Sequence, residues 1–223
     1  MTTRTLPFLA LAAALAVPGQ AAAKAGDINA KLLATLVAPD GKIKTLDDPL
    51  DLLPAGSQAK ASDNVVPTVA IEYYVTDAVS IETIAGVTKH HVNGAGALAG
   101  ASLVSKASII PATLTIKYHL GAEGGIRPYI GAGPSYFLFL GEKVGSDAAT
   151  LGATRVKIND KVGAALQAGI DVPVGDSGLS VTLDAKRYFM RPTAHFFAGG
   201  TEALTTRHKL DPWVVSAGVG FRF

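Results

Sequence analysis

Apolar and polar residues alternate regularly along residues 213–223 of the chain. The apolar residues occupy every second position: Trp213, Val215, Ala217, Val219, Phe221 and Phe223. Small or polar residues stand between them, with Val214 as the exception. Because successive side chains of a strand point to opposite faces, this segment predicts a β-strand with one apolar and one mostly polar face. Strands of a membrane β-barrel need about ten residues of this pattern, apolar toward lipid and polar toward the lumen.

Seven more stretches alternate in the same way and are bounded by turn residues. The predicted strands are therefore residues 27–37, 66–75, 79–89, 110–120, 126–140, 161–172, 179–189 and 213–223. Three connections between them are short, at residues 76–78, 121–125 and 173–178. Four are long, at residues 38–65, 90–109, 141–160 and 190–210.

An even number of strands, with short turns at one end and long loops at the other, is typical of outer-membrane barrels. The pattern predicts an all-β fold, an eight-stranded antiparallel up-and-down transmembrane β-barrel with periplasmic N- and C-termini. A soluble lipocalin-like barrel or an all-β sandwich is the alternative, since both also consist of short alternating strands. Charges in the middle of the polar faces, long loops at one end and an aromatic residue at position 223 favour the membrane barrel.

Residues 1–23 have the features of a secretory signal peptide. Arg4 supplies the positive start, residues 6–17 are mostly apolar, and residues 21–23 are alanines that suit cleavage before Lys24. The apolar stretch is shorter than the roughly 20 residues of a spanning helix, so a membrane anchor is the less favoured alternative, as is a buried core helix. We expect residues 24–223 to form one outer-membrane β-barrel domain.

The composition excludes several classes of function. The chain has no cysteine, which rules out a disulfide framework, thiolate catalysis and a cysteine zinc site. Its formal net charge of +2 gives no basic footprint for nucleic acid. Charged residues make up only 17% and there are 24 glycines, as closely packed alternating strands would require. We predict no cofactor and no metal site.

The polar faces of the strands would line the lumen. The charged lumen candidates are Lys31, Glu72, Glu82, Lys117, Asp171, Asp184, Lys186 and Arg222. Four acids and four bases predict ion pairing inside the barrel rather than an ion-selective field. Apolar lumen-lining candidates are Leu33, Ile84, Phe137, Phe139 and Val214. They indicate a dry constriction or a small apolar pocket, unless they lie at the rim or the register shifts at a bulge.

Aromatic residues fall on the outward face, most of them near strand ends: Tyr73, Tyr118, Tyr136, Trp213, Phe221 and Phe223. Their positions suit the aromatic girdles of a membrane barrel, whereas a soluble fold would use them for core packing. The last strand, ending in Phe223, is also expected to contact the barrel-assembly machinery.

We expect no enzymatic activity. The sequence contains neither a His-Glu-x-x-His nor a Gly-x-Ser-x-Gly motif. His90 and His91 are adjacent, so in a strand they would point to opposite faces and could not share a metal ion, although in a loop they could. The glycine-rich residues 94–100 lack the Lys-Ser/Thr ending of a phosphate loop and indicate a flexible loop.

Four segments resemble, in the same order, the outer-membrane protein W (OmpW) family of Gram-negative bacteria. They are residues 76–82, residues 111–114, the Arg-Pro-Tyr-Ile-Gly-Ala-Gly segment at residues 127–133, and Asp-Pro-Trp at residues 211–213 with the closing residues 220–223. Residues 47–54 and 187–192 depart from the family pattern, and the hydrophobic gate of the family cannot be matched residue by residue.

The resemblance implies an eight-stranded barrel with a narrow, partly hydrophobic lumen. It implies that the chain passes or binds small hydrophobic molecules and releases them sideways into the membrane. The expected partners are then outer-membrane lipid and small hydrophobic solutes. The alternative is a structural or receptor barrel that acts through its extracellular loops.

Overall fold

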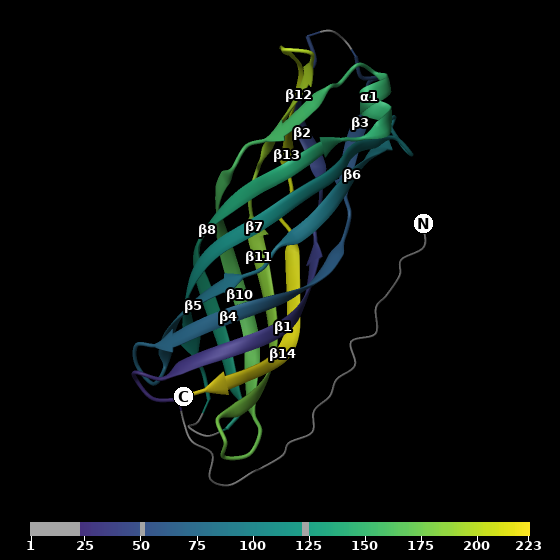
Figure 1. The fold of residues 1–223 in the computed structure, drawn as a ribbon. Helices are drawn as coiled ribbons and strands as arrows, with labels where there is room; N and C mark the ends of the chain where they lie inside the picture. The colour runs from purple at the N-terminus through teal and green to yellow at the C-terminus, as the bar shows by residue number, and fades with distance from the viewer. Residues whose placement is uncertain (1–22, 50–51, 122–124) are drawn as a thin grey trace.

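The computed structural model describes residues 23–49, 52–121 and 125–223, which form a closed antiparallel barrel extended at one end by a second sheet (Figure 1). Strand β1 (Ile28–Ala38) pairs with β4 (Asn64–Tyr74) on one side and with β14 (Trp213–Arg222) on the other. The first and last wall strands therefore join directly. Residues 1–22 of the predicted signal peptide lie outside the described residues.

The other wall strands follow in chain order. They are β5 (Val79–Ala85), β7 (Ser102–His119), β8 (Arg127–Val144), β10 (Lys161–Pro173) and β11 (Leu179–Phe189), and β11 pairs with β14. Strand β6 (Thr88–Gly96) continues β5 along the same neighbour, β7, so the two share one position in the wall. Counted in this way the wall has eight strands, and the predicted eight-stranded antiparallel barrel is confirmed.

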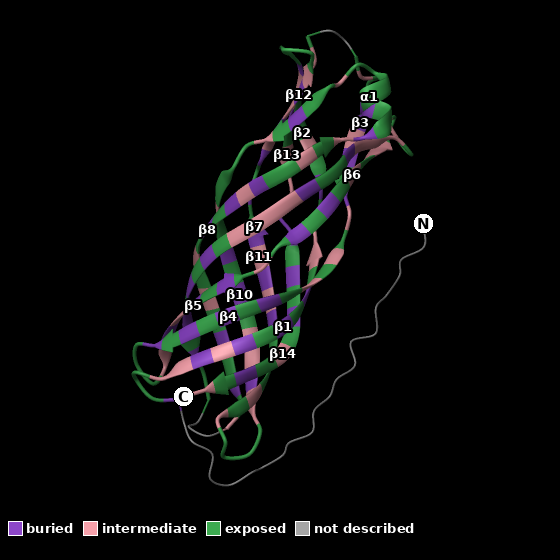
Figure 2. Ribbon diagram, in the orientation of Figure 1, coloured by how far each residue is buried: buried purple, intermediate pink, exposed green. Residues whose placement is uncertain are grey.

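The outer face of the barrel is apolar. Buried and exposed residues alternate along the wall strands (Figure 2), and the exposed positions hold large apolar side chains such as Leu32, Ile71 and Ile116. The six outward aromatic residues of the sequence prediction are all exposed: Tyr73, Tyr118, Tyr136, Trp213, Phe221 and Phe223. Strand β1 has 11 residues, which at a tilt of about 40° rise roughly 25 Å, the height of an outer-membrane apolar band.

The two ends of the barrel differ. The terminal end carries Ile28 and Phe223, whose backbones exchange two hydrogen bonds of 2.9 and 3.0 Å, together with the short turns. At the loop end, β7 and β8, of 18 residues each, continue beyond the apolar band. A four-stranded sheet stands there, in the order β2 (Lys42–Asp47), β13 (Thr201–Lys209), β12 (Thr193–Ala198) and β9 (Arg155–Ile158) (Figure 1).

The prediction of four long loops was therefore wrong for much of residues 38–65, 90–109, 141–160 and 190–210. Besides that sheet, they contain β3 (Ser57–Ala61), most of β6, the first residues of β7, the last of β8 and helix α1 (Ser146–Thr150). Only the end of the predicted glycine-rich loop, after Gly96, forms a turn. The alternation test missed these strands because most of them are short and four of their pairings shift register: β12 with β13, β13 with β2, β6 with β7, and β7 with β8. The described residues include no helix long and apolar enough to cross a membrane.

Candidate functional site

Seven charged side chains meet inside the barrel at the terminal end, and we call them the ionic network: Lys31, Glu72, Glu82, Lys117, Asp171, Asp184 and Lys186. Lys117 Nζ lies 2.7 Å from Glu72 Oε1 and 3.0 Å from Glu82 Oε2. Lys31 Nζ lies 2.8 Å from Glu72 Oε2, and Lys186 Nζ lies 2.7 Å from Asp184 Oδ1. Buried charges at these distances compensate one another.

Neutral side chains complete the network. Gln167 Nε2 donates to Glu82 Oε1 at 2.9 Å and to Asp184 Oδ2 at 2.6 Å. The Tyr129 hydroxyl donates to Asp184 Oδ2 at 2.8 Å, and the Thr182 hydroxyl donates to Asp171 Oδ1 at 2.6 Å. No member of the ionic network is more than 5% exposed, so side chains fill the lumen at this level.

The eighth charged candidate, Arg222, lies at the mouth of the terminal end. Its Nε is 3.6 Å from Asp27 Oδ2, and its side chain is partly exposed. Arg127 instead is buried, opposite Asp171 in the pairing of β8 with β10, and it donates to the carbonyl of Asp77. Sequence analysis missed Arg127 because it stands at the start of its strand, beside a glycine-rich turn.

His119 contacts a serine and a carboxylate, but without the geometry of a catalytic triad. Ser80 Oγ lies 2.9 Å and Glu72 Oε1 lies 2.8 Å from the same ring nitrogen, Nε2. A triad needs the nucleophile on one ring nitrogen and the carboxylate on the other. In the part of the chain that the structure describes, no group of three or more His, Cys, Asp or Glu residues could hold a metal ion. His90 is buried and His91 is exposed, on opposite faces of β6 as a strand requires.

The structure places the five apolar candidates inside the barrel. Leu33 and Ile84 form a small buried cluster with Ala70. Phe137, Phe139 and Val214 belong to a second cluster, which also contains Ala165, Tyr188 and Met190. Within it the rings of Phe137 and Tyr188 meet edge to face, with centroids 5.3 Å apart. A cavity of about 50 Å³ lies against these side chains and is also lined by Thr68 and Gly86.

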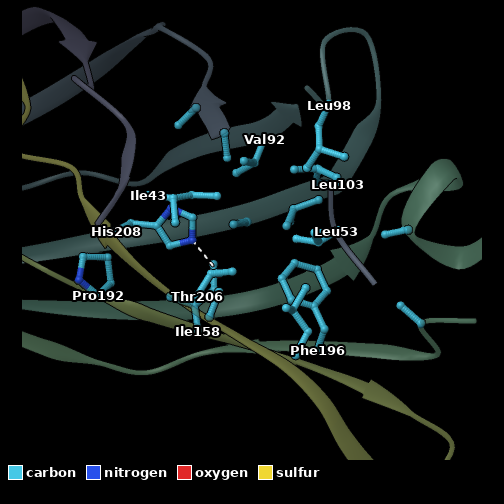
Figure 3. A pocket seen from close by; sticks show the side chains of 18 of the residues that line it. Ile43, Leu53, Val92, Leu98, Leu103, Ile158, Pro192, Phe196, Thr206 and His208 are labelled. Atoms are coloured by element: carbon cyan, nitrogen blue, oxygen red, sulfur yellow. Dashed lines mark hydrogen bonds between the residues drawn. The ribbon is translucent and has the colours of Figure 1, made fainter. Parts of the chain in front are cut away.

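A larger cavity of about 220 Å³ lies at the loop end (Figure 3). Strands β2, β3, β6, β7, β12 and β13, helix α1 and the neighbouring loops all contribute to its lining, with side chains such as Leu53, Leu103 and Phe196. His90, Ile109 and Leu210 line both cavities, which are therefore adjacent. Sequence analysis missed this site because its walls come from segments predicted to be loops.

Among the described residues, three polar side chains line the larger cavity: His90, Thr206 and His208. His90 uses both ring nitrogens, at 2.6 Å from the carbonyl oxygen of Ser62 and 3.0 Å from the hydroxyl of Thr88. His208 Nε2 lies 2.8 Å from the Thr206 hydroxyl (Figure 3). Strand β13 lies outside the apolar band, and burial there lowers the pKa of His208 to about 4, so its ring is neutral near pH 7.

The barrel wall has a break beside the smaller cavity. The pairing of β4 with β5 ends at Val69 opposite Ala85, and beyond this point the described residues of β4 and β6 form no backbone ladder. In this stretch of the described residues the side chain of Asn64 bridges the two strands, donating to the carbonyl of Lys89 at 2.7 Å. Just before β4, the backbone N–H of Ser62 donates to the carbonyl of His91 at 2.9 Å and marks the far edge of the break. The predicted strand 79–89 ran through this break because the alternation continues across Gly86.

Gly86 permits a close approach at the break. A Cβ atom at this position would lie 2.6 Å from Thr68 Cγ2 and 3.4 Å from Thr68 Cβ. Pro67, next to Thr68, has no backbone N–H to donate. The wall between β4 and β6 is thus held by side-chain contacts instead of a continuous ladder.

Comparisons with known proteins agree with this architecture. The sequence matches the OmpW family over residues 24–223. An uncharacterised outer-membrane protein of Sinorhizobium fredii, y4mB, is 36% identical over 168 residues, which cover 75% of this chain and 70% of y4mB. The dibenzothiophene metabolism operon protein PahQ of Pseudomonas aeruginosa is 33% identical over 171 residues, 75% of this chain and 76% of PahQ.

The fold is also similar to a solved outer-membrane protein, OprG of Pseudomonas aeruginosa. The TM-score is 0.80 at 24% identity, with 90% of this chain and 97% of OprG covered. The likeness to OprG concerns the fold, whereas the family match spans the whole barrel from Lys24 to Phe223. The chain therefore belongs to the OmpW family of outer-membrane β-barrel proteins.

Proposed function

We propose that this protein takes up small apolar molecules at the loop end and releases them sideways into the membrane between β4 and β6. The observation that carries the proposal is the position of the two adjacent cavities inside the barrel. The apolar cavity of about 220 Å³ adjoins the cavity of about 50 Å³, which borders Thr68 and Gly86 at the break in the wall. Among the described residues that line this route, none carries a charged side chain.

The other direction is unfavourable for such a solute. The ionic network fills the barrel below the apolar clusters, and its seven charged side chains come from six wall strands. Straight passage would separate buried ion pairs, which costs several kcal/mol for each charge left uncompensated. We therefore place the exit in the wall and not at the terminal end.

Two further points belong to the proposal. The loop end faces the outside and both termini face the periplasm, since the longer connections between wall strands of outer-membrane barrels lie outside. The solutes are small hydrocarbons or heteroaromatic molecules. The name of PahQ supports this class, because dibenzothiophene is an apolar aromatic compound. A cavity of about 150 Å³ with a similar apolar lining binds benzene, so about 220 Å³ suffices for a small aromatic solute.

A reversible cross-link tests the route. The distance of 3.4 Å between Thr68 Cβ and the Cβ position of Gly86 is close to that of a disulfide, and the chain contains no cysteine that would compete. Liposomes that contain the Thr68→Cys/Gly86→Cys variant should take up naphthalene slowly while the two cysteines are oxidised. After reduction, they should take it up at the wild-type rate. Unchanged uptake in the oxidised state would rule out an exit between β4 and β6.

A matched control places the cross-link one residue away, where the neighbouring wall strands β4 and β5 are still paired. Val69 lies opposite Ala85, so the Val69→Cys/Ala85→Cys variant adds a cross-link without spanning the break. Its naphthalene uptake should not depend on oxidation. If the wild-type protein itself moved no more naphthalene than empty liposomes, the alternative of a structural or receptor barrel, acting through the loop-end sheet, would take precedence.

A further inference from the structure

Among the polar side chains of the described lining of the larger cavity, one ring nitrogen has no hydrogen-bond partner. Both ring nitrogens of His90 are already occupied, by Ser62 and Thr88. The Thr206 hydroxyl is engaged with His208 Nε2 at 2.8 Å. The other ring nitrogen of His208, Nδ1, has no partner among the described residues, and Figure 3 shows the ring beside Ile43 in the cavity wall.

A neutral histidine can serve two kinds of solute. If the Thr206 hydroxyl donates to Nε2, then Nδ1 carries the proton and can donate to a carbonyl oxygen. If Nε2 donates to Thr206, then Nδ1 accepts from a solute hydroxyl. A charged solute group finds no opposite charge among the described lining residues, which are otherwise apolar, and burying an unpaired charge is very unfavourable.

We propose that His208 determines specificity, so that the cavity prefers small apolar molecules with one neutral hydroxyl or carbonyl group over pure hydrocarbons. This inference rests on the proposed function, because it assumes that the cavity is the solute site. His208 and Thr206 both lie on β13, two residues apart, which holds their hydrogen bond in place. The solute class therefore includes phenols, alcohols and ketones of apolar skeletons.

The test compares two probes of similar shape, 2-naphthol and 2-methylnaphthalene. Binding to the folded protein in lipid nanodiscs is measured by equilibrium dialysis, with empty nanodiscs subtracting partition into lipid. One hydrogen bond in an apolar site corresponds to roughly a tenfold difference in Kd. We expect 2-naphthol to bind about tenfold more tightly to the wild type, and we expect the His208→Phe variant to lose this preference while it retains 2-methylnaphthalene.

The matched control is His195→Phe, which changes a histidine of the same sheet that does not line the cavity. It should keep the preference for 2-naphthol. Circular dichroism and the gel mobility of unboiled samples verify that each variant is folded.

Each result has one meaning. Equal Kd values for the two probes in the wild type, or a preference that persists in His208→Phe, would overturn the role of His208 while the proposed uptake of apolar solutes stands. If neither probe bound above the empty-nanodisc level, both the proposed function and this inference would fail.

Discussion

Lys117 Nζ lies 3.7 Å from the centroid of the Tyr129 ring while the same nitrogen contacts Glu72 Oε1 at 2.7 Å. The ammonium group thus exchanges its hydration for two carboxylates and an aromatic face, inside a barrel whose outer surface is apolar. Such a group stabilises the barrel only as long as its partners remain in place.

The Lys117→Met variant should be strongly destabilised. It removes the positive charge between Glu72 and Glu82 and leaves part of their negative charge buried without compensation. Breaking a buried pair in this way costs about 3–5 kcal/mol. Urea unfolding in detergent micelles measures the change, and Lys143→Met, at an exposed position of β8, is the control, with an expected change below about 0.5 kcal/mol. A similar small change for both variants would contradict the role of the network.

Gly169→Ala should disturb the same region by steric overlap. A Cβ at Gly169 would lie 2.3 Å from the Tyr129 hydroxyl oxygen and 2.5 Å from the carbonyl oxygen of Leu183. We expect a loss of about 1–3 kcal/mol in unfolding free energy, because the added methyl group has no room between the Tyr129 ring and the backbone of Leu183. Gly200→Ala, where no atom lies within 4 Å of the added Cβ, should leave stability nearly unchanged. Equal effects at Gly169 and Gly200 would argue against this packing.

The sheet at the loop end should open more easily in acid. Histidine in the opened sheet titrates near pH 6.5, whereas burial lowers the pKa of His208 to about 4 in the closed sheet. The opened form therefore takes up a proton first as the pH falls. The stability of the closed form is complete above about pH 7 and declines between pH 6.5 and 4, by about 2 kcal/mol at pH 5.

Hydrogen exchange of the β13 amides at pH 7.5 and pH 5 measures this change, after correction for the intrinsic pH dependence of exchange. The His208→Phe variant should show no such loss of protection. If wild type and variant lost protection equally, another group would be responsible.

Phe223 should contribute to assembly of the barrel. The residue is 67% exposed and its ring stacks on Phe221 with centroids 6.2 Å apart, while its backbone pairs with Ile28 at the seam. We predict that the barrel-assembly machinery binds this exposed aromatic ring next to the seam. The Phe223→Ala variant should reach the outer membrane in smaller amounts, measured by fractionation and by the shift of the folded band on boiling. Phe189→Ala, an exposed phenylalanine near the loop end of β11, should assemble normally.

The membrane-spanning part of the fold could be predicted because two different solvents impose the period of two. Residues such as Ile71 face the apolar outside of the barrel, whereas residues such as Glu72 face the charged inside. Apolar and polar residues therefore alternate along the strands. The register of the ionic network followed from the same rule. Its partners Tyr129 and Gln167 did not, since an aromatic or amide residue on the inner face has no charge that requires compensation.

The loop-end site could not be predicted, for a physical reason. The lining of its cavity includes residues as distant in sequence as Ile43, Leu103 and His208, which no local pattern relates. Strand β12 has only six residues, and its pairing with β13 shifts register while its pairing with β9 is regular, so its alternation is too brief to detect. The break beside Gly86 was invisible because backbone pairing depends on neighbouring strands and not on the order of apolar residues.

The ionic network also has a consequence for the cell. Its members are side chains of the wall strands themselves. The network therefore fills the lumen without a separate plug domain, for as long as the strands remain paired. A bacterium could therefore insert many copies into its outer membrane without admitting salts or hydrophilic antibiotics. Permeability to water-soluble toxic compounds should stay constant as expression rises, so that the number of barrels in the membrane is separated from loss of the osmotic and chemical barrier.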